Sequence, residues 1–417
     1  MKIEIISTGE EILTGSVVDT NAAYIAQLCD EKGYIVIRHS TTGDDYSALV
    51  DLFMESGKRS DVTIVTGGLG PTSDDRSAEA AATAVGCQLI QNDAAVCSIE
   101  NYFSGRQGSM SSSDMKQTLL PETADCINNI FGTAPGFKLT IGCSLFFFLP
   151  GVPVEMKGMF KTEVIPIIDN LSGYDRKVFL KKSLFLFGLP EAVVNERLND
   201  MAKLYPTIEL GFRAAFPVIE IKLKYEIDPA DASDEMEIHF NQAVNWVEQQ
   251  VGDYIFSDVS GKIEVVVGRL LVEKKKTLAV AESCTGGLIG HKLTEAAGSS
   301  DYFLTSCVTY ANSSKIDILG VDPKTIEVFG AVSEETVKEM AEGVRKISGA
   351  DYAVATSGIA GPDGGSPDKP VGSVFIGLAD ENETKAFEFR SPFADRNKNK
   401  IIFYIKTLDL LRRLLLS

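Results

Sequence analysis

The sequence predicts an α/β protein made of three consecutive units. Residues 1 to about 170 alternate short β-branched runs with helical patterns, which favours a mostly parallel sheet covered by helices. This alternation breaks at a polar, glycine-containing link near residues 171–175, and a smaller α+β pattern continues to residue 258. Strand and helix patterns alternate again from Lys262 onward. We therefore expect domains at residues 1–172, 173–258 and 259–417.

The first unit should place its ligand site at one edge of the sheet. In open parallel sheets, ligands bind beyond the carboxyl ends of the strands, so the turns that follow the strands are of most interest. The expected strands are Lys2–Ser7, Tyr34–His39, Val62–Thr66 and Ser144–Leu149, and the expected helices are Asn21–Lys32, Tyr46–Ser56, Asp75–Val85 and Glu155–Ile168.

The second and third units differ in pattern, and no fixed period relates any of the three, which excludes a solenoid. In the second unit we expect strands at Lys177–Phe187, Ile208–Phe212 and Val218–Tyr225, and helices at Glu191–Leu204 and Ala230–Val251, the latter capped by the acidic segment Asp228–Asp231. In the third we expect helices at Lys262–Lys275, Cys284–Ala296, Ser314–Leu319, Ser333–Ser348 and Asp395–Leu415, and strands at Thr277–Ala281, Tyr302–Tyr310, Tyr352–Ser357, Gly372–Asp380 and Glu383–Phe389.

The composition excludes several classes of protein. Of the 417 residues, 40 are Lys or Arg and 58 are Asp or Glu, so the formal net charge is −18. This balance argues against a broad surface for nucleic acid or anionic membranes, since both need clustered cations. The most apolar stretch, residues 145–154, is far shorter than the roughly 20 residues that span a bilayer. Seven scattered cysteines without a C-x-x-C pair, and no signal peptide, predict a cytoplasmic protein.

Three glycine-containing turns follow expected strands of the first unit, at residues 8–15, 66–75 and 150–155. The order of the strands places all three at one edge of the sheet. The second turn combines glycines that admit a ligand close to the backbone with hydroxyls that precede an expected helix, whose free N–H groups favour phosphate: Gly67, Gly68, Gly70, Thr72 and Ser73.

Carboxylates accompany these turns. Asp74, Asp75 and Glu10 are oxygen ligands of the kind that divalent cations prefer, and a cation beside the phosphate would neutralise it. The same segment also suits a plain helix start, with Thr72 or Ser73 as the N-cap and the acids favoured by the helix dipole. A capped helix alone does not account for three glycine turns at one sheet edge.

The third unit offers a serine with a lysine as its base. Ser283 lies at a strand-to-helix turn, where backbone N–H groups can meet a developing oxyanion. Lys315 begins a short helix five residues after Tyr310, and burial would make its amine neutral and basic. Tyr310 would pass a proton to the leaving group. Taken singly, Ser283 also suits an N-cap, Tyr310 a half-buried strand position and Lys315 a solvated surface.

A second nucleophile and two glycine turns complete the pattern. Cys284 follows Ser283, but its nearest histidine in sequence, His291, is seven residues away, or about 10 Å along a helix. Cys284 is therefore interpreted as a small core residue. The turns at residues 357–365 and 369–372 can hold a nucleotide phosphate, with help from Arg396 or Lys369.

The N-terminal motifs resemble a known family. The segment Thr66–Asp75, together with Asp19-Thr20-Asn21 and Pro150–Glu155, resembles the N-terminal domain of the CinA (competence/damage-inducible protein A) family, which is similar to the three-layer α/β fold of the molybdopterin-binding proteins MoaB and MogA. The resemblance implies an ADP-ribose pyrophosphatase that depends on Mg, Mn, Co or Ni. Glu10 stands where the family usually has Asp, which changes the position of the carboxylate.

The third unit resembles the CinA C-terminal domain, through residues 281–287, Val308-Thr309-Tyr310 with Lys315, residues 330–333, 358–362 and 369–372. That domain is similar to the PncC type of nicotinamide mononucleotide deamidase. The resemblance implies that Ser283 and Lys315 are the catalytic pair, that Tyr310 assists, and that no metal is needed. It also implies substrate contacts from Thr285, Gly286, Gly287, Ser357, Gly358, Gly361 and Arg396.

The middle unit resembles the KH-like spacer of full-length members of the family. Its turn Gly188-Leu189-Pro190-Glu191 lacks the second glycine of a nucleic-acid-binding KH loop, so we interpret the unit as a spacer or a dimerisation module. The family resemblance implies a homodimer.

Together these patterns predict a nicotinamide mononucleotide amidohydrolase that forms nicotinic acid mononucleotide and ammonia, with a second, ADP-ribose pyrophosphatase activity. Two alternatives stay open. The N-terminal domain could bind a pterin or nucleotide without turnover, or the chain could be an accessory protein of competence or recombination.

Overall fold

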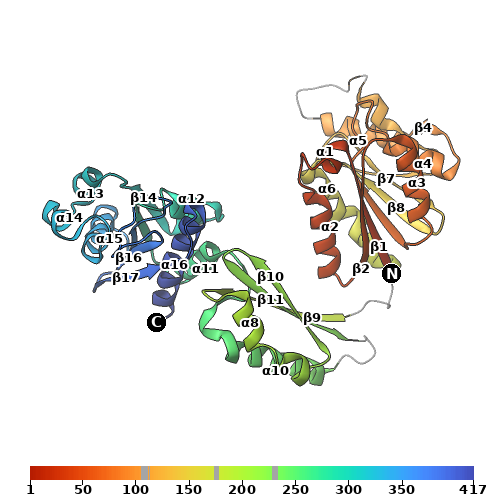
Figure 1. Ribbon diagram of the computed structural model, residues 1–417. Helices are drawn as coiled ribbons and strands as arrows, with labels where there is room; N and C mark the ends of the chain where they lie inside the picture. Colours follow the sequence, from red (N-terminus) through yellow and green to blue (C-terminus); the bar gives the residue numbers. More distant parts are fainter. Residues whose placement is uncertain (105–110, 112, 173–177, 228–232) are drawn as a thin grey trace. The chain divides into compact units, whose positions relative to one another are not determined.

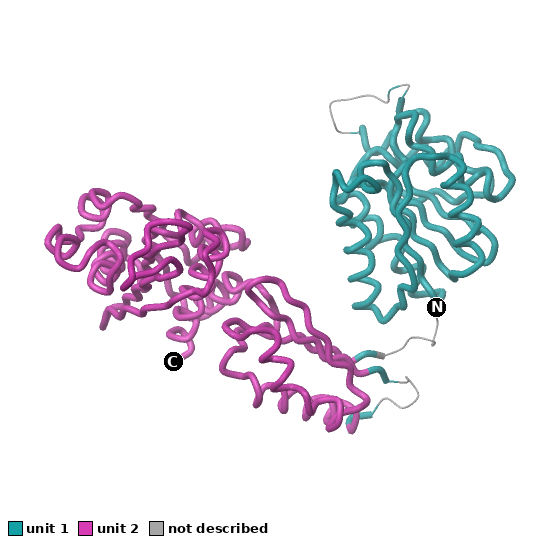
Figure 2. The backbone as a smooth tube through the Cα atoms, viewed as in Figure 1, with its two compact units in different colours: residues 1–179, 226–234 teal, residues 180–225, 235–417 magenta. Residues whose placement is uncertain are grey.

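The computed structural model describes residues 1–104, 111, 113–172, 178–227 and 233–417 (Figure 1). The chain forms two compact units, residues 1–179 with 226–234 and residues 180–225 with 235–417 (Figure 2). Most of the expected link at 171–175 and the expected capping segment Asp228–Asp231 lie outside the described residues. The division into three domains stays a prediction. In the part of the chain that the structure describes, no helix has the length and apolar character needed to cross a membrane.

The first unit is built on a six-stranded sheet in the order β2-β1-β3-β8-β7-β6. The first four strands in this order run parallel, and β7 and β6 are antiparallel additions. This confirms the expected mostly parallel sheet. The strands are β1 Lys2–Thr8, β2 Ile35–Thr42, β3 Val62–Thr66, β6 Asp125–Ile127, β7 Gly136–Ile141 and β8 Ser144–Leu149, and a separate pair is formed by β4 Leu89–Gln91 and β5 Leu119–Pro121.

Helices cover both faces of this sheet because successive strand residues point to opposite sides. In β8, Phe147 and Leu149 pack with α2, α6 and α7, whereas Phe146 and Phe148 pack with α3 and α4. The helices are α1 Glu10–Leu13, α2 Thr20–Glu31, α3 Tyr46–Ser56, α4 Ser77–Val85, α5 Asp93–Phe103, α6 Pro153–Met159 and α7 Ile165–Ser172, with a 3₁₀ turn at Asp114–Thr118 and a π turn at Phe160–Val164.

Two expected helices of this unit differ from the structure, and several elements were not expected. The helix expected at Asp75–Val85 begins only at Ser77. The helix expected at Glu155–Ile168 is divided by the π turn between α6 and α7. Among the elements that were not expected are β7, which forms a hairpin with β8 through Gly142 and Cys143, and α5, whose N-cap Asn92 accepts a hydrogen bond from the Ala95 amide at 3.1 Å.

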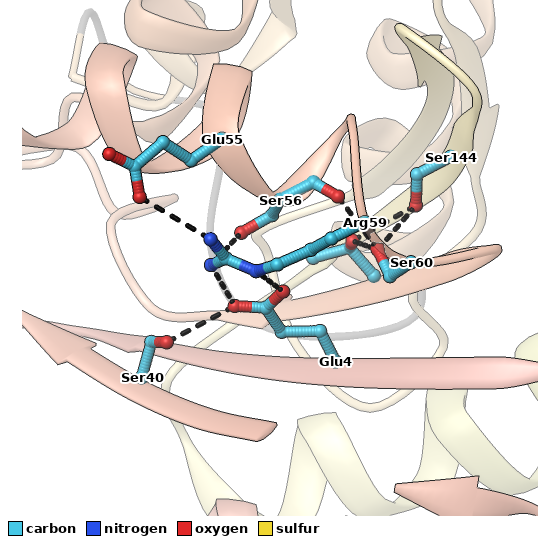
Figure 3. A network of polar contacts seen from close by, with 8 residues as sticks. Glu4, Ser40, Glu55, Ser56, Arg59, Ser60 and Ser144 are labelled. Atoms are coloured by element: carbon cyan, nitrogen blue, oxygen red, sulfur yellow. Dashed lines mark hydrogen bonds and ion pairs between the residues drawn. The ribbon is translucent and has the colours of Figure 1, made fainter. Parts of the chain in front are cut away.

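A buried carboxylate inside β1 is matched by one arginine. Glu4 is 0% exposed, and Arg59 donates to it through Nε at 2.8 Å and Nη2 at 2.6 Å (Figure 3). Ser40 adds a third donor to Glu4 at 3.1 Å. Arg59 also reaches Glu55 at 3.3 Å. The bidentate geometry offsets the desolvation of Glu4 and ties the segment after α3 to the first strand of the sheet.

The second unit begins with a four-stranded sheet in the order β10-β11-β9-β12. The helix expected at Glu191–Leu204 is two shorter helices, and both expected hairpin strands extend further than predicted. The elements are β9 Val178–Phe187, α8 Glu191–Arg197, α9 Met201–Leu204, β10 Ile208–Ala215, β11 Val218–Ile227, α10 Asp234–Val251, a 3₁₀ turn Gly252–Tyr254 and β12 Ile255–Ser257. The KH-like interpretation of this part stays a prediction.

The rest of the second unit is a five-stranded sheet in the order β14-β13-β15-β16-β17, parallel from β14 to β15 and antiparallel beyond. Every expected strand and helix of this part is present, with one correction discussed below, and α14 was missed. The elements are α11 Ile263–Lys274, β13 Leu278–Glu282, α12 Leu288–Glu295, a 3₁₀ turn Ser299–Asp301, β14 Phe303–Val308, α13 Asn312–Leu319, α14 Pro323–Phe329, α15 Glu334–Ser348, β15 Tyr352–Gly358, β16 Ser373–Ala379, β17 Thr384–Arg390 and α16 Arg396–Leu416.

The two faces of this sheet have different side chains. Leu278, Val280 and Val354 pack against α11, α12 and α16. The opposite face presents alanines of β13 and β15, including Ala279 and Ala281, to α15. Small side chains let α15 lie close to this face of the sheet.

Removing the partner of the buried Glu4 carboxylate should destabilise the first unit. We expect Arg59→Ala to cost about 3–5 kcal/mol, because Glu4 would be left buried and unpaired. Hydrogen–deuterium exchange of peptides that cover β1 and β3 measures the effect. Lys58→Ala, at the exposed neighbouring position, is the control and should change exchange little. Equal exchange in Arg59→Ala and wild type would show that the pair does not stabilise the sheet.

Candidate active site

Ser283 occupies a turn that a buried carboxylate fixes. The strand β13 ends at Glu282, and residues 283–287 form the turn before α12. The expectation that a helix begins at Cys284 was therefore wrong by four residues. Glu282 is buried and accepts hydrogen bonds from the amides of Ile289 at 3.1 Å and Gly290 at 2.8 Å. This carboxylate neutralises free N–H groups of α12 and holds the turn against the strand.

Lys315 reaches Ser283 from α13, the helix that follows β14. Its Nζ lies 3.1 Å from Ser283 Oγ, 2.9 Å from the carbonyl oxygen of Thr309 and 3.1 Å from that of Tyr310. Lys315 is 1% exposed. In the part of the chain that the structure describes, it forms no ion pair with a carboxylate. The structure thus brings together the serine and lysine that the sequence singled out, and it excludes a solvated surface position for the lysine.

The environment favours a neutral amine at Lys315. Burial lowers the pKa of this lysine, because the charged form loses its hydration and gains no counter-charge. A neutral amine has two N–H donors and one lone pair. As placed, Lys315 Nζ donates to both carbonyl oxygens and to Ser283 Oγ. When the amine is neutral, the two carbonyl oxygens can keep its donors, and its lone pair can accept from the Ser283 hydroxyl. The contacts of Lys315 therefore match those of a general base.

Tyr310 and Arg396 stand at the exposed side of the serine–lysine pair. Arg396 donates from Nη2 to the Tyr310 hydroxyl at 3.0 Å and from Nη1 to the carbonyl oxygen of Gly361 at 2.9 Å. The side chain of Tyr310 is 59% exposed, so Tyr310 is not the half-buried strand residue that it could have been from its sequence position alone. Its hydroxyl proton is not used in the contact with Arg396. The proton remains available to a bound molecule.

Several other residues expected to contact the substrate already form hydrogen bonds or close packing contacts within the protein. Thr285 forms a hydroxyl–hydroxyl bond with Thr356 at 2.9 Å, and Ser357 donates to the carbonyl oxygen of Ala331 at 2.6 Å. At Gly358 an added Cβ would lie 2.5 Å from the carbonyl oxygen of Ser373, so packing alone requires glycine there. Lys369, named as an alternative cation, donates to the carbonyl oxygen of Phe329 at 3.1 Å. Substrate contacts from Thr285, Gly286, Gly287, Ser357, Gly358 and Gly361 stay predictions.

Cys284 is a poor nucleophile in this environment. Its side chain is buried among Ala360, Val374 and Phe403. Burial raises the pKa of the thiol to about 12, so the thiolate is scarce at neutral pH. This supports Ser283 over its neighbour as the reacting group.

The three glycine turns of the first unit line one cavity. It has a volume of about 510 Å³ and is bordered by residues after β1, β3 and β8. Among the residues expected there, the lining includes Gly67, Gly68, Gly70, Thr72, Asp74 and Asp75. Glu10 and Ser73 do not line it. Glu11, Asp19, Asp44 and Glu155 do, although the sequence analysis did not name them as ligands.

The helix N-terminus expected directly after Thr72 and Ser73 is wrong, and phosphate binding by this loop stays a prediction. Because α4 begins at Ser77, Thr72 and Ser73 cap no helix, and the Thr72 amide donates instead to Asp75 at 2.9 Å. Lys116 donates to the carbonyl oxygen of Asp75 at 2.8 Å. This cation comes from a segment about 40 residues later, which no local pattern could have revealed.

The carboxylates of the cavity do not form a preformed metal site. Among the described residues, no group of three or more His, Cys, Asp or Glu side chains is placed to hold one cation. Burial raises the pKa of Glu155, although a hydrogen bond from Asn129 at 2.7 Å works in the opposite direction. The side chains as placed therefore do not fit the metal that the resemblance implies.

Two amide oxygens in the same cavity have no partner. Asn21 and Gln117 are 8% and 7% exposed, and Oδ1 of the first and Oε1 of the second accept no hydrogen bond within the described chain. Their amide nitrogens donate to carbonyl oxygens, of Gly151 at 2.8 Å and Leu69 at 3.0 Å, which fixes the orientation of each group. Buried acceptors of this kind call for donors on a bound molecule.

Comparison with known proteins shows which family the chain resembles over its length. Family models match residues 4–170 as "Probable molybdopterin binding domain" and residues 260–415 as "CinA C-terminal domain". A CinA-like protein from Desulfosudis oleivorans is 48% identical over 416 residues, with 100% of both chains covered. A Shewanella oneidensis protein named nicotinamide-nucleotide amidohydrolase PncC is 40% identical over 417 residues, covering 100% of this chain and 96% of that one. Among solved structures, the competence/damage inducible protein CihA from Agrobacterium tumefaciens is 39% identical over 39% of this chain and 100% of its own, with a TM-score of 0.36.

The fold and the two sites thus define a chain with a molybdopterin-binding type of α/β domain at its start and a second α/β domain carrying a serine–lysine pair at its end. Relatives match it over its whole length. The chain belongs to the CinA family.

Proposed function

We propose that the protein hydrolyses the carboxamide of nicotinamide mononucleotide to nicotinic acid mononucleotide and ammonia. The observation that carries this proposal is the 3.1 Å contact between Ser283 Oγ and the buried Lys315 Nζ, in surroundings without a counter-charge. The amidohydrolase name of the Shewanella oneidensis relative supports the same substrate. Serine–lysine pairs suit amide hydrolysis because a neutral amine both removes the serine proton and returns it to the leaving group.

In the first step the Ser283 oxygen attacks the carboxamide carbon while its proton passes to Lys315. The carbonyl oxygen becomes negatively charged, and backbone N–H groups of the turn at residues 284–287 are the nearest donors to it. Protonated Lys315 then returns its proton to the amide nitrogen, either directly or through the Tyr310 hydroxyl, which passes on its own proton and takes the one from Lys315. The C–N bond breaks and ammonia leaves. An acyl group remains on Ser283.

In the second step water attacks the acyl group. Lys315, neutral again, takes a proton from the water, and the bond to Ser283 Oγ breaks with return of that proton to the serine. Arg396 holds the Tyr310 hydroxyl by the 3.0 Å hydrogen bond, which restricts the ring beside the reacting carbonyl. All proton transfers use groups of this chain and water.

We propose ADP-ribose hydrolysis as a second activity, in the cavity of the first unit. The unpaired oxygens of Asn21 and Gln117 favour a ligand with hydroxyl and amino donors, and ADP-ribose carries both kinds of group. The carboxylates that line the cavity do not explain how the anionic pyrophosphate would bind, and the metal dependence rests on the resemblance alone. A homodimer, which the resemblance implies, and a cytoplasmic location, which the scattered cysteines favour, are further proposals.

Loss of either member of the serine–lysine pair should abolish deamidation. We expect Ser283→Ala and Lys315→Ala to lower kcat/KM for nicotinamide mononucleotide by at least about 10³-fold, because each removes a group that acts in the transition state. Ammonia release measures the rate. Cys284→Ala is the matched neighbour and should keep most activity. Substantial turnover by Ser283→Ala would contradict the mechanism, and no turnover by the wild type would favour an accessory role for the chain.

The pH dependence of kcat/KM should reflect the protonation of Lys315. Only neutral Lys315 can take the serine proton, so kcat/KM rises with pH until the lysine is deprotonated. Because burial lowers the pKa of Lys315 from its ordinary 10.5, the rise should level off below that pH. Lys315→Arg stays protonated and should be inactive throughout. A wild-type rate that still increases tenfold per pH unit near pH 10 would show that the lysine keeps its ordinary pKa.

The two proposed activities should separate by mutation. With Mg, Mn, Co or Ni present, we expect the wild type to convert ADP-ribose to AMP and ribose 5-phosphate, as chromatography would show. Asp75→Asn should lower this rate about 10- to 100-fold, because Asp75 holds the loop that borders the cavity. Ser283→Ala should retain it. If ADP-ribose stays intact with all four metals, the cavity is a binding site without pyrophosphatase activity.

A further inference from the structure

Lys400 lies beside the turn that carries the nucleophile. It belongs to α16, its side chain is half-buried, and its Nζ is 3.7 Å from the position that a Cβ on Gly286 would take. Gly286 has φ +62°, a conformation that favours glycine, so no side chain separates the ammonium from the turn. The lysine and Ser283 are 117 positions apart in sequence, and the fold brings the lysine to the turn that Ser283 begins.

Lys400 has no counter-charge. Within the described residues it forms no hydrogen bond or ion pair. Arg396 lies four residues earlier on α16 and so faces the same side of the helix. The hydrogen bonds of its guanidinium go to Tyr310 and Gly361, both uncharged acceptors. In a chain with a net charge of −18, two neighbouring cations without a carboxylate partner at a candidate active site call for an anion.

There is room for that anion. Apart from Lys400, no heavy atom of a neighbouring segment lies within 4 Å of the added Cβ position at Gly286, and at Gly287 the only one is a methyl group of Val308 at 3.5 Å. The space over the turn is therefore open, with Lys400 at its border. A ligand atom can approach both the backbone of the turn and the ammonium.

We propose that Lys400 and Arg396 bind the phosphate of the substrate and thereby select the nucleotide over the nucleoside. This inference rests on the deamidase proposed above and adds the residue that confers its specificity. A phosphate monoester carries a charge of about −1.5 to −2 at neutral pH. Arginine supplies a planar fork of donors and lysine a compact charge, and both form charge-assisted hydrogen bonds with phosphate. Lys369, the alternative from the sequence, is bound to the carbonyl oxygen of Phe329 instead.

The test compares two substrates that differ only in the phosphate, nicotinamide mononucleotide and nicotinamide riboside. For Lys400→Met we expect the ratio of kcat/KM between nucleotide and riboside to fall about 10- to 100-fold, the cost of losing a hydrogen bond to a charged group. Lys400→Arg should restore most of the ratio. Lys398→Met is the matched control, because Lys398 lies on the same turn of α16 over the rings of Phe216 and Phe393. It should leave the ratio unchanged.

Binding without turnover gives an independent measurement. In a Ser283→Ala background, calorimetry should show that Lys400→Met weakens nicotinamide mononucleotide about 10- to 100-fold. Inorganic phosphate should inhibit the wild type competitively and Lys400→Met much less. Equal losses with both substrates would overturn the inference, since Lys400 would then act on the turn and not on the phosphate. A wild type that deamidates neither substrate would refute the proposed function itself, which is a different outcome.

Discussion

The C-terminal site depends on one constraint, a lysine amine that is buried beside a serine without a carboxylate. Such a group is costly when charged, so the fold must hold it in place by other means. The ends of two neighbouring parallel strands do this. The carbonyl oxygens of Thr309 and Tyr310, just after β14, accept from Lys315, and β13 delivers Ser283 at 3.1 Å. The Ser283 amide donates to the carbonyl oxygen of Thr356 at 3.0 Å, which continues the ladder to β15 past the last paired residue of β13. Sheet register thus sets the distance between nucleophile and base.

The two α/β domains use the same edge of a parallel sheet for opposite electrostatic purposes. In the first, six acidic side chains near the strand ends line a cavity, together with unpaired amide oxygens. In the other, the carboxylate that precedes the nucleophile, Glu282, is occupied by amides of α12, and two cations without a carboxylate partner among the described residues border the open space. The cavity of the first unit suits a ligand with polar donors. The space beside Ser283 suits an anionic ligand. The family resemblance implies both activities. Only the side-chain positions show how the charges around the two sites differ.

Much of the fold follows from local sequence. Val62–Thr66, Ser144–Leu149 and Tyr46–Ser56 were predicted to the residue, because apolar runs between glycine, proline and capping residues leave little freedom. The pairing of Ser283 with Lys315, which are 32 positions apart, was also predicted, from the ends of two expected strands and from the family resemblance. The start of α4 was wrong because the acids after Gly70 hydrogen-bond within their own loop and do not cap the helix. Lys116 and Lys400 were missed since each reaches its site from a distant segment. Glu282 could have been noticed, as a charged residue that ends an otherwise apolar strand.

The net charge of −18 gives the placed cations their importance. An acidic chain repels an anionic nucleotide at long range, although salt at physiological strength screens exposed charges beyond about 8 Å. Attraction must therefore arise at short range, inside the open space beside α16. There the partly buried Lys400 is screened less than a surface lysine, and Arg396 is already oriented by Tyr310 and Gly361. A preoriented cation loses little side-chain entropy when the ligand arrives. Selectivity for a phosphorylated substrate can thus coexist with an acidic surface, because it depends on two positions of one helix and not on the overall charge.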